Sequence, residues 1–540
     1  MRKKKDFLFG AFILSASNLL IKLIGAVFRV PLTEIVGVTA MGYFSSAYNI
    51  YNLLLSIATA GLPIGISVMI SRSLATGKLR DISRIMKIAA LSFVSAGAVL
   101  SVLGMVFARQ IAVFMNSEDA YYAVFWLMPA VFCISVVSLF KGFFQGFGNM
   151  APTATSNLVE ASVKLIAGLS IAYYVSRVLG GSDAEAVGGA IAGITLSTFC
   201  AMTYMGLRYL FRKQDYRFSR EDLLKSPETE RKILYRSFFS VAFPVMLSSI
   251  SANLMAAIDS FSVVNCLKGY NDIERSNFLY GAYGNMALTI FNLPVIFIGS
   301  IGVALVPEIS SLFVRKEKKA LKVSMERSVK TSAIISFACA GGLLAVSHEA
   351  VALLFSDDEA VAIASVLLKI LTFVIICVGY TTVFNSILNS IKRSTSSVVA
   401  IFIGSAIKSI FTFIFVSIPF LNIYGAPLAT CIAYPVMMII GYYFVKKHTV
   451  VKMDMKEIFF KPLLSGVLCY IPAKILNWLF NMLIPSRYTV ILTVIVTAAI
   501  FFVLILLFKI VTLDELKGII RKDDKNKEKG NDDEISVQRD

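Results

Sequence analysis

A chain with many apolar runs long enough to cross a bilayer must fold as a membrane protein, and the first such run covers residues 7–31. A spanning helix needs about 20 predominantly apolar residues. The whole chain of 540 residues is 57% hydrophobic and only 16% charged, whereas soluble domains carry about 25% charged residues. The sequence therefore predicts an all-α integral membrane protein.

Hydropathy and loop positions predict fourteen spans with both termini on the cytoplasmic side. Their limits are 7–31, 41–71, 86–108, 121–147, 153–176, 187–211, 237–264, 281–313, 329–348, 361–390, 396–418, 425–445, 458–482 and 488–508. In this topology the inside segments hold 41 of the 52 Lys and Arg residues, the outside loops 5 and the spans 6. Because Lys and Arg favour the cytoplasmic side, this asymmetry supports the count. These basic residues lie in short loops, so we expect no nucleic-acid partner.

A sparse internal repeat relates the two halves of the chain. A shift of 240 residues aligns Asn149 with Asn389 and Asn52 with Asn292. Six spans per unit is an even number, so the copies share an orientation and predict two pseudo-symmetric six-helix lobes with a site between them. The expected domains are an N-lobe (1–213), a cytoplasmic basic loop (214–236), a C-lobe (237–447), two extra C-terminal helices (448–513) and a disordered cytoplasmic tail (514–540).

The first span carries two cations on one helical face. Lys22 and Arg29 are seven residues apart, almost two turns, and Asn18 and Gly25 continue the same stripe. A cation at mid-bilayer costs at least about 2.5 kcal/mol, so such groups usually face a cavity or a partner. The alternatives are that Arg29 extends to the outer interface and that Lys22 pairs with a carboxylate.

Further charged residues lie within the expected spans. Glu160 and Lys164 are an i,i+4 pair, for which mutual neutralisation is the favoured interpretation. Asp259 is alone in its helix, which makes it a candidate site for a coupling ion or proton. Pairing of Asp259 with Lys408 or Lys22 is the alternative.

Two expected spans contain residues that interrupt helices. The second contains Gly61 and Pro63, and the eighth contains Pro294, Gly299, Gly302 and Pro307. Bends at such residues often serve motion or binding, and ordinary packing through small residues is an equal alternative. We assign structural or gating roles to Glu160, Lys164, Glu308, Asn52 and Asn292.

Cations exceed acids within the spans, so a cavity lined by them suits an anionic substrate. Phosphate or diphosphate fits because Arg and Lys neutralise phosphate oxygens strongly. The residues expected to bind a diphosphate are Lys22, Arg29, Asn18 and Lys408. The sequence shows no Ser/His/Asp arrangement, no metal-ligand spacing and no phosphate-binding Gly loop, so we expect no enzyme activity, metal or cofactor.

Three segments resemble a known family. They are KGFFQGFGNMAPTATSNLVEASVKLIAG from Lys141, GLPIGISVMISR from Gly61 and VPEISSLF from Val306. The first is similar to the fourth-to-fifth span signature of the polysaccharide-exporter branch of the multidrug/oligosaccharidyl-lipid/polysaccharide superfamily, particularly stage V sporulation protein B and the MurJ-type lipid II flippases. The resemblance covers essentially the whole chain. Relatives often have Arg where this chain has Lys164, so the match between this chain and the family is incomplete at that position.

The resemblance implies an alternating-access flippase of the bacterial plasma membrane. It would move an undecaprenyl-diphosphate-linked saccharide, with lipid II as the leading candidate, from the inner to the outer leaflet. Arg29 matches a basic residue that is important in relatives, and spans 13 and 14 match helices that border a groove for the lipid tail. The implied partners are this lipid-linked saccharide, membrane lipids, and a coupling ion (sodium or proton) or the membrane potential.

Other functions remain as alternatives at this stage. They are a cation-coupled multidrug exporter of the same superfamily, a flippase for another lipid-linked oligosaccharide, a membrane glycan polymerase or acyltransferase, and a non-transporting assembly scaffold. Exporters of the first kind usually have twelve spans and an acidic cavity. A polymerase needs catalytic groups at the outer surface, where the loops offer only His348, Glu349 and the acidic run 357–359.

Overall fold

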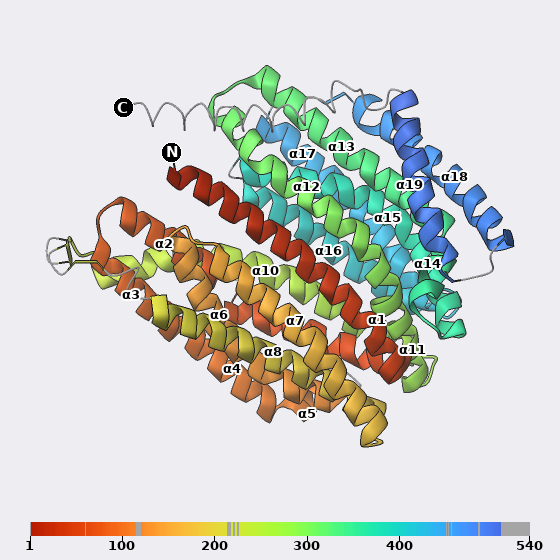
Figure 1. The fold of residues 1–540 in the computed structure, drawn as a ribbon, viewed down its shortest axis with the longest axis horizontal. Helices are drawn as coiled ribbons and strands as arrows, with labels where there is room; N and C mark the ends of the chain where they lie inside the picture. Colours follow the sequence, from red (N-terminus) through yellow and green to blue (C-terminus); the bar gives the residue numbers. More distant parts are fainter. Residues whose placement is uncertain are drawn as a thin grey trace.

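The computed structural model is a bundle of long helices with no strand in its described part (Figure 1), which confirms the all-α prediction. The described backbone comprises residues 2–59, 61–114, 120–212, 218–219, 222–223, 226–391, 393–449, 451, 453–454, 456–483 and 487–508. Side chains are not described for some helical residues, including most of residues 1–19 and residues 300–308. The expected tail at 514–540 lies outside the described residues.

The first half of the chain forms ten helical elements. They are α1 (Arg2–Thr59), α2 (Leu62–Ala75), α3 (Leu79–Ala89), η1 (Ala90–Val94), α4 (Ser95–Val106), α5 (Ala108–Phe114), α6 (Tyr121–Gly146), α7 (Ala151–Tyr173), η3 (Tyr174–Val178) and α8 (Asp183–Arg212). The elements η1 and η3 are short π-helical turns that continue the preceding α-helices.

The second half continues with longer helices. They are α10 (Arg231–Lys268), α11 (Ile273–Gly281), η5 (Ala282–Ala287), α12 (Leu288–Val314), α13 (Lys318–Ala345), α14 (Ser347–Leu354), α15 (Asp358–Ser390), α16 (Ser394–Val416), η6 (Asn422–Tyr424), α17 (Gly425–Thr449), η7 (Lys456–Phe460), α18 (Lys461–Leu483) and α19 (Thr489–Leu507). The last two helices lie at one side of the bundle (Figure 1).

Within the described residues, twelve helices are long and apolar enough to cross a membrane. The count of fourteen is therefore not confirmed and stays a prediction. One of the twelve, Leu23–Ala75, has 53 residues, or about 80 Å of helix against a hydrocarbon core of about 30 Å. It folds back at Gly37, whose φ of 80° and ψ of 166° are not helical. The 38-residue α10 is not among the twelve.

The predicted interruptions are present in the second span but not in the eighth. Helix α1 ends at Thr59 and α2 begins at Leu62, with Pro63 in its first turn, where a missing N–H costs nothing. In contrast, α12 runs as one helix through residues 294–307, without a break, and the two alternatives for its Gly and Pro residues stay open. The irregular part of this segment is the π-helical element η5, which precedes α12.

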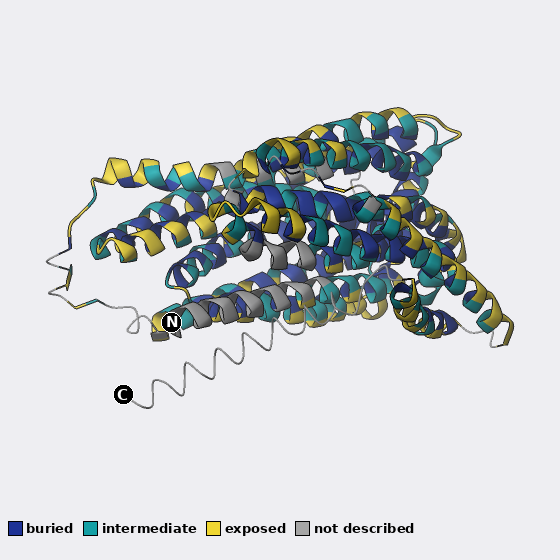
Figure 2. Cartoon of the chain, turned by 90° about the horizontal axis from the view of Figure 1, so that it is seen from above, coloured by how far each residue is buried: buried dark blue, intermediate teal, exposed yellow. Residues whose placement is uncertain are grey.

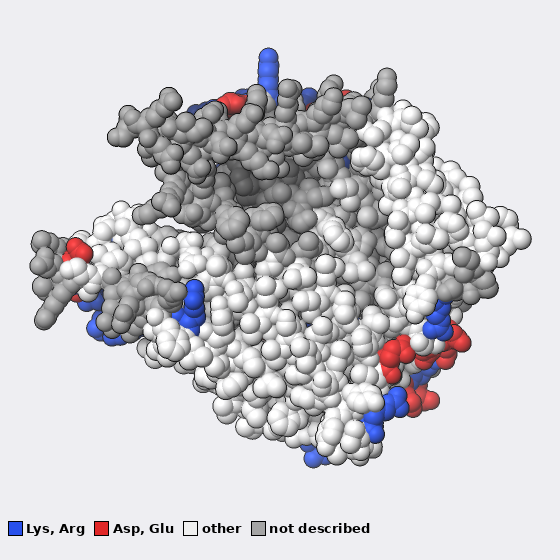
Figure 3. Space-filling model, viewed as in Figure 1, with Lys and Arg blue, Asp and Glu red and all other residues white. Residues whose placement is uncertain are grey.

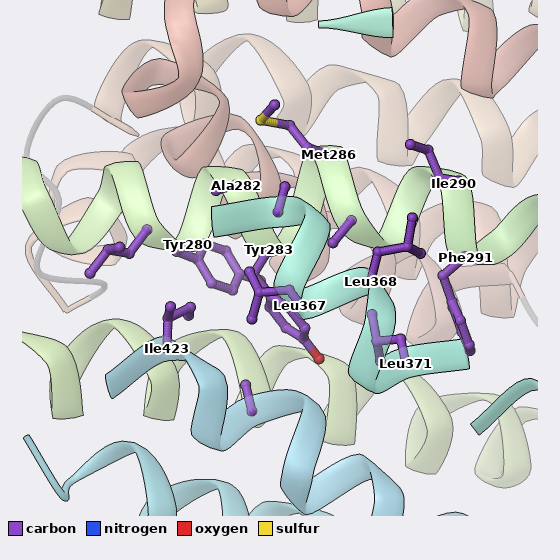
Figure 4. Packing of buried hydrophobic residues seen from close by; sticks show 14 of the residues in the cluster. Tyr280, Ala282, Tyr283, Met286, Ile290, Phe291, Leu367, Leu368, Leu371 and Ile423 are labelled. Atoms are coloured by element: carbon purple, nitrogen blue, oxygen red, sulfur yellow. The ribbon is translucent and has the colours of Figure 1, made fainter. Parts of the chain in front are cut away.

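Buried apolar side chains form two large clusters in each half of the chain. In the first half they join α1 to α6 and α8 at one end, and α2, α3, α6 and α8 at the other. In the second half, one cluster packs α11, η5 and α12 against α15, where Tyr283, Leu368 and Leu371 interdigitate (Figure 4). Another joins α12, α13, α15 and α17.

The same neighbours pack in both halves. Helix α8 packs on α6 and α7, and α17 packs on α15 and α16 in the same way. Gly97 of α4 lies against Ser135 of α6, and Gly379 of α15 lies against Ser336 of α13. These parallels support the division into two lobes, which stays a proposal. The start of α10 is an exception to the expected boundary at 237, because Phe238 and Ala242 belong to a cluster of the first half.

The surface fits a lipid environment. On the face shown in Figure 3, the described charged side chains gather toward the ends of the bundle, and a broad uncharged surface lies between them. Exposed residues occupy the outer faces of the helices, while buried ones face inward (Figure 2). Many exposed side chains are large and apolar, including Leu91, Ile166 and Trp478. Such exposure is stable only where lipid covers it.

The two halves are in direct backbone contact where α1 crosses α11. A Cβ atom added at Gly42 would overlap the carbonyl oxygen of Asn277, and one added at Gly281 would overlap that of Val38. Small residues at such crossings let two helix backbones touch, which is how helices associate within lipid. Next to this crossing, the side-chain amide of Asn285 donates to the carbonyl oxygen of Met41.

A polar clamp joins the halves at the other end of the bundle. Asp81 of α3, 1% exposed, accepts hydrogen bonds from the backbone N–H of Thr229 (3.1 Å) and its hydroxyl (2.5 Å). Glu228 pairs with Arg80 at 3.1 Å and with Arg84 at 2.6 Å. The clamp thus fixes the segment that leads into α10 against the α2–α3 turn.

We predict that Gly42→Ala destabilises the protein because its new Cβ meets backbone, which cannot rotate away. The matched control is Gly206→Ala in α8, where a Cβ meets nothing within 4 Å. Ala has a higher helix propensity than Gly by up to about 1 kcal/mol, so Gly206→Ala should leave the stability of the protein unchanged or increase it. Thermal melting of the purified variants in detergent measures the difference. Equal melting temperatures would contradict the close crossing.

We predict that Asp81→Ala releases the segment before α10, because the Thr229 N–H loses its buried acceptor at a cost of about 1–3 kcal/mol. Trypsin should then cleave after Arg231 and Lys232 several-fold faster than in the parent. Glu228→Gln is the control, since its partly exposed ion pairs contribute about 0–1 kcal/mol. Unchanged cleavage of Asp81→Ala would show that the clamp does not hold this segment.

Candidate functional site

A cavity of about 280 Å³ lies between the first and second halves of the chain. Helix α1 contributes residues on both sides of its fold at Gly37, α7 contributes one residue, and α12 closes the opposite wall. The lining residues are Gly25, Ala26, Phe28, Arg29, Phe44, Tyr48, Lys164, Thr289, Asn292, Val295 and Ile296. Two of them are cations and none is a carboxylate.

Arg29 reaches across the cavity from α1 to the second half. Its guanidinium donates to the carbonyl oxygen of Gly284 and to the hydroxyl of Thr289, both at 3.3 Å. Gly284 lies in η5, and π-helical turns shift backbone carbonyls out of the regular ladder. Both bonds are longer than the usual 2.9–3.0 Å. A guanidinium has five N–H donors, so Arg29 keeps donors for a ligand.

Lys164 enters the same cavity from α7. Its Nζ atom lies 5.1 Å from the ring centre of Phe28 and 5.0 Å from that of Tyr48. Cation–π contacts are worth about 0.5–2 kcal/mol and leave the ammonium N–H groups free to donate. The rings therefore position this cation without neutralising it.

The predicted neutralisation of Lys164 by Glu160 is wrong for this structure. The ion pairs of the described residues do not include these two side chains, although they are one turn apart. The reason is tertiary, because the aromatic side chains of α1 hold Lys164 on the cavity side of α7.

Arg29 and Lys164 together can bind an anion. Their charges add in a cavity with no carboxylate among its lining residues, where water screens them less than at the surface. The volume admits a diphosphate rather than a whole lipid-linked saccharide, since sites for drug-sized ligands measure roughly 300–1,000 Å³. The remainder of a larger substrate would lie outside this cavity.

Asp259 and Lys408 form a second polar centre, between α10 and α16. The Lys408 Nζ atom donates to Asp259 Oδ2 at 2.7 Å, and the Thr412 hydroxyl donates to Oδ1 at 3.0 Å. Asp259 is 8% exposed. The view of Asp259 as an unpaired acid is thus corrected, and the alternative of pairing with Lys408 holds. For the same reason, Lys408 is engaged by a carboxylate and does not line the cavity.

The other predicted site residues divide into three groups. Asn292 lines the cavity, whereas Asn52 is half-buried and its backbone carbonyl accepts the Ser56 hydroxyl at 2.8 Å. The side chains of Lys22, Asn18 and Glu308 lie outside the described residues. The position of Lys22 on the stripe of Gly25 and Arg29 stays a prediction from the sequence spacing.

Sequence reasoning missed the groups that hold the two cations. Thr289, the Gly284 carbonyl and the rings of Phe28 and Tyr48 are ordinary residues of membrane helices, without a motif that marks them. The i,i+4 spacing of Phe44 and Tyr48, which stack with ring centres 5.6 Å apart, is the one local signal of an aromatic wall.

Family models match most of this chain. The model described as "Polysaccharide biosynthesis protein" matches residues 7–313, and the MatE model matches residues 244–414. The chain is 23% identical over 495 residues to the lipid II flippase MurJ of Bacillus subtilis (strain 168), covering 88% of this chain and 90% of the relative. It is 22% identical over 522 residues to stage V sporulation protein B of the same organism, covering 96% and 98%.

Solved structures share the fold. A lipid II flippase MurJ in an inward closed conformation superposes with a TM-score of 0.69 at 13% identity, covering 91% of this chain and 97% of that one. An inward-facing multidrug resistance MATE family transporter superposes with a TM-score of 0.65 at 15% identity, covering 80% and 94%. The chain belongs to the polysaccharide biosynthesis protein family, and it is a membrane transporter of the multidrug/oligosaccharidyl-lipid/polysaccharide superfamily.

Proposed function

We propose that this protein is a flippase that moves a saccharide linked to undecaprenyl diphosphate from the inner to the outer leaflet of the bacterial plasma membrane. Lipid II is the leading candidate substrate. The observation that carries this proposal is the pair of unneutralised cations, Arg29 and Lys164, in one cavity between the two halves. In this proposal both cations bind the diphosphate, and Lys22, which shares the helical stripe of Arg29 in the sequence, joins them.

The cavity also supports a mode of transport. Arg29 on α1 and Lys164 on α7 both belong to the first half of the chain, and Arg29 also bonds to Gly284 and Thr289 of the second half. A diphosphate that bound both cations would compete for the Arg29 N–H groups and weaken these bonds between the halves. Differential binding of this kind is what shifts a transporter between inward-open and outward-open states.

A cation-coupled multidrug exporter is the second candidate, because the MatE model matches residues 244–414 and MATE structures share the fold. Exporters of cationic drugs need negative charge where the drug binds. The lining residues of this cavity supply positive charge instead. The charge of the cavity therefore favours an anionic lipid-linked substrate over a cationic drug.

We predict that Arg29→Ala and Lys164→Ala each weaken binding of a diphosphate-linked lipid. Loss of a charged contact to a buried anion costs roughly 2–5 kcal/mol, or tens- to thousands-fold in affinity. Arg29→Lys should be partly defective, because Lys supplies a point charge where Arg can engage two oxygens. Lys22→Ala should also be severely defective, because Lys22 shares the helical stripe of Arg29. Binding to purified variants measures these effects.

Lys369→Ala is the matched control, since it removes an exposed lysine of α15 that does not line the cavity. Complementation of a strain depleted of its lipid II flippase, at matched expression, tests the substrate. Rescue by the parent and failure of the Arg29 and Lys164 variants would support the proposal. If both alanine variants bind and transport like the parent, the diphosphate binds elsewhere.

We predict that Asp259→Asn destabilises the protein by about 3–5 kcal/mol, because it leaves Lys408 buried without its counter-charge. Asp259→Asn combined with Lys408→Met should recover most of this loss in thermal melting. The double variant therefore shows whether Asp259 couples transport to an ion or only stabilises the fold. Loss of transport in a stable double variant would support a coupling role for Asp259, and normal transport at every pH and sodium concentration would make the pair purely structural.

A further inference from the structure

A second cavity, of about 320 Å³, lies where α14 and α18 meet, far along the sequence from the cavity described above. Its lining residues are Glu349, Lys474, Asn477, Trp478, Asn481 and Met482. Five of the six lie on α18, which together with α19 follows the two halves of the chain. The cavity therefore belongs to the C-terminal helix pair and not to the site between the halves.

A chain of hydrogen bonds orients the carboxylate of this cavity. The Asn477 side-chain amide donates to Glu349 Oε1 at 2.7 Å. Asn481 donates to Asn477 at 3.5 Å, and the Thr489 hydroxyl donates to Asn481 at 2.8 Å. Asn477 is 4% exposed, so this chain is an internal support that joins α14, α18 and α19. It engages one carboxylate oxygen and leaves acceptor capacity on the other.

Lys474 adds a positive charge to the same cavity. It lies three residues before Asn477, on the same face of α18. The ion pairs found among the described residues, with N···O distances up to 4.0 Å, do not include Lys474 with Glu349. A cation and a carboxylate thus line one cavity without neutralising each other, which suits a ligand that carries both charges.

Two exposed apolar residues beside the cavity indicate how deep in the membrane the cavity lies. Trp478 is 67% exposed and Met482 is 73% exposed, and they continue the face of Lys474 at four-residue spacing. Both lie in the last two turns of a spanning helix. Trp concentrates at the boundary between lipid tails and head groups, so this rim places the polar cavity at head-group level.

We propose that this cavity binds the head group of a bilayer phospholipid that carries both a phosphate and a primary ammonium, as phosphatidylethanolamine does. Lys474 binds the phosphate, and Glu349, oriented by Asn477, accepts hydrogen bonds from the ammonium. The ring of Trp478 covers the first part of the lipid chains. A trimethylated head group has no N–H to donate, so the site discriminates against phosphatidylcholine.

The test uses the fluorescence of Trp478 in the full chain. The sequence has two Trp residues, so Trp126→Phe makes Trp478 the only one. The protein is reconstituted in phosphatidylglycerol nanodiscs with rising fractions of phosphatidylethanolamine or phosphatidylcholine. We expect the emission to shift with phosphatidylethanolamine at a fraction at least about ten-fold lower than with phosphatidylcholine, as expected for one charged hydrogen bond.

Glu349→Gln should abolish this preference, and Lys474→Gln should weaken binding of both zwitterionic lipids. Lys268→Gln, which removes the lysine at the end of α10, is the charge-matched control and should change neither. Equal titration by the two lipids, or a preference that survives Glu349→Gln, would overturn the proposal. The comparison of lipids on the single-Trp chain remains decisive even if the Glu349 variant does not fold.

Two further experiments test whether the head group belongs to a membrane phospholipid. Soluble glycerophosphoethanolamine should compete at least ten-fold less well than the lipid, because it lacks the chains that Trp478 covers. Competition at equal strength would make this a site for a free metabolite and overturn the lipid proposal. A shift caused by a lipid-linked saccharide in discs where phosphatidylethanolamine has no effect would likewise overturn it, in favour of the transported substrate.

Discussion

A charge inside a bilayer is costly unless it pairs with an opposite charge or faces a polar cavity. The buried charges of this protein meet this constraint in two ways. Asp259 and Lys408 neutralise each other at 2.7 Å, with Thr412 on the second carboxylate oxygen. Among the described residues, the partners of Arg29 and Lys164 are neutral: a carbonyl, a hydroxyl and two aromatic rings. The first pair satisfies the requirement internally, whereas the second two cations line a cavity whose described lining has no carboxylate.

The position of this cavity follows from the way the backbone is interrupted. In lipid every backbone group needs a partner, so departures from the helix persist only where protein covers them. The fold at Gly37 returns α1 to the bundle, which brings Phe28 and Tyr48 to the same wall. The π-helical turn η5 lies opposite and presents the Gly284 carbonyl to Arg29. The first irregularity connects the two parts of α1 that line the site, and the second supplies an acceptor to Arg29.

The two halves of the chain contact each other at both ends of the bundle. The α1–α11 crossing is held by direct backbone contact at Gly42 and Gly281. The clamp between Asp81 and Thr229, in contrast, is made of a few hydrogen bonds and partly exposed ion pairs. Backbone contact occurs near the clamp as well, because a Cβ atom added at Gly61 would overlap the carbonyl oxygen of Ala242, and Phe238 packs in an apolar cluster of the first half. Close packing therefore joins the halves at both ends of the bundle.

The sequence by itself determined the membrane class, the helical content and the family resemblance, because long apolar runs and loop charges are local signals. It also identified Arg29 as a cavity residue, since helical periodicity fixes which residues share a face. Only the tertiary structure decided which charges meet. Glu160 and Lys164 are one turn apart yet unpaired, while Asp259 and Lys408 are 149 residues apart and bonded. The physical reason is that neutralisation depends on packing between helices, which no spacing along one helix encodes.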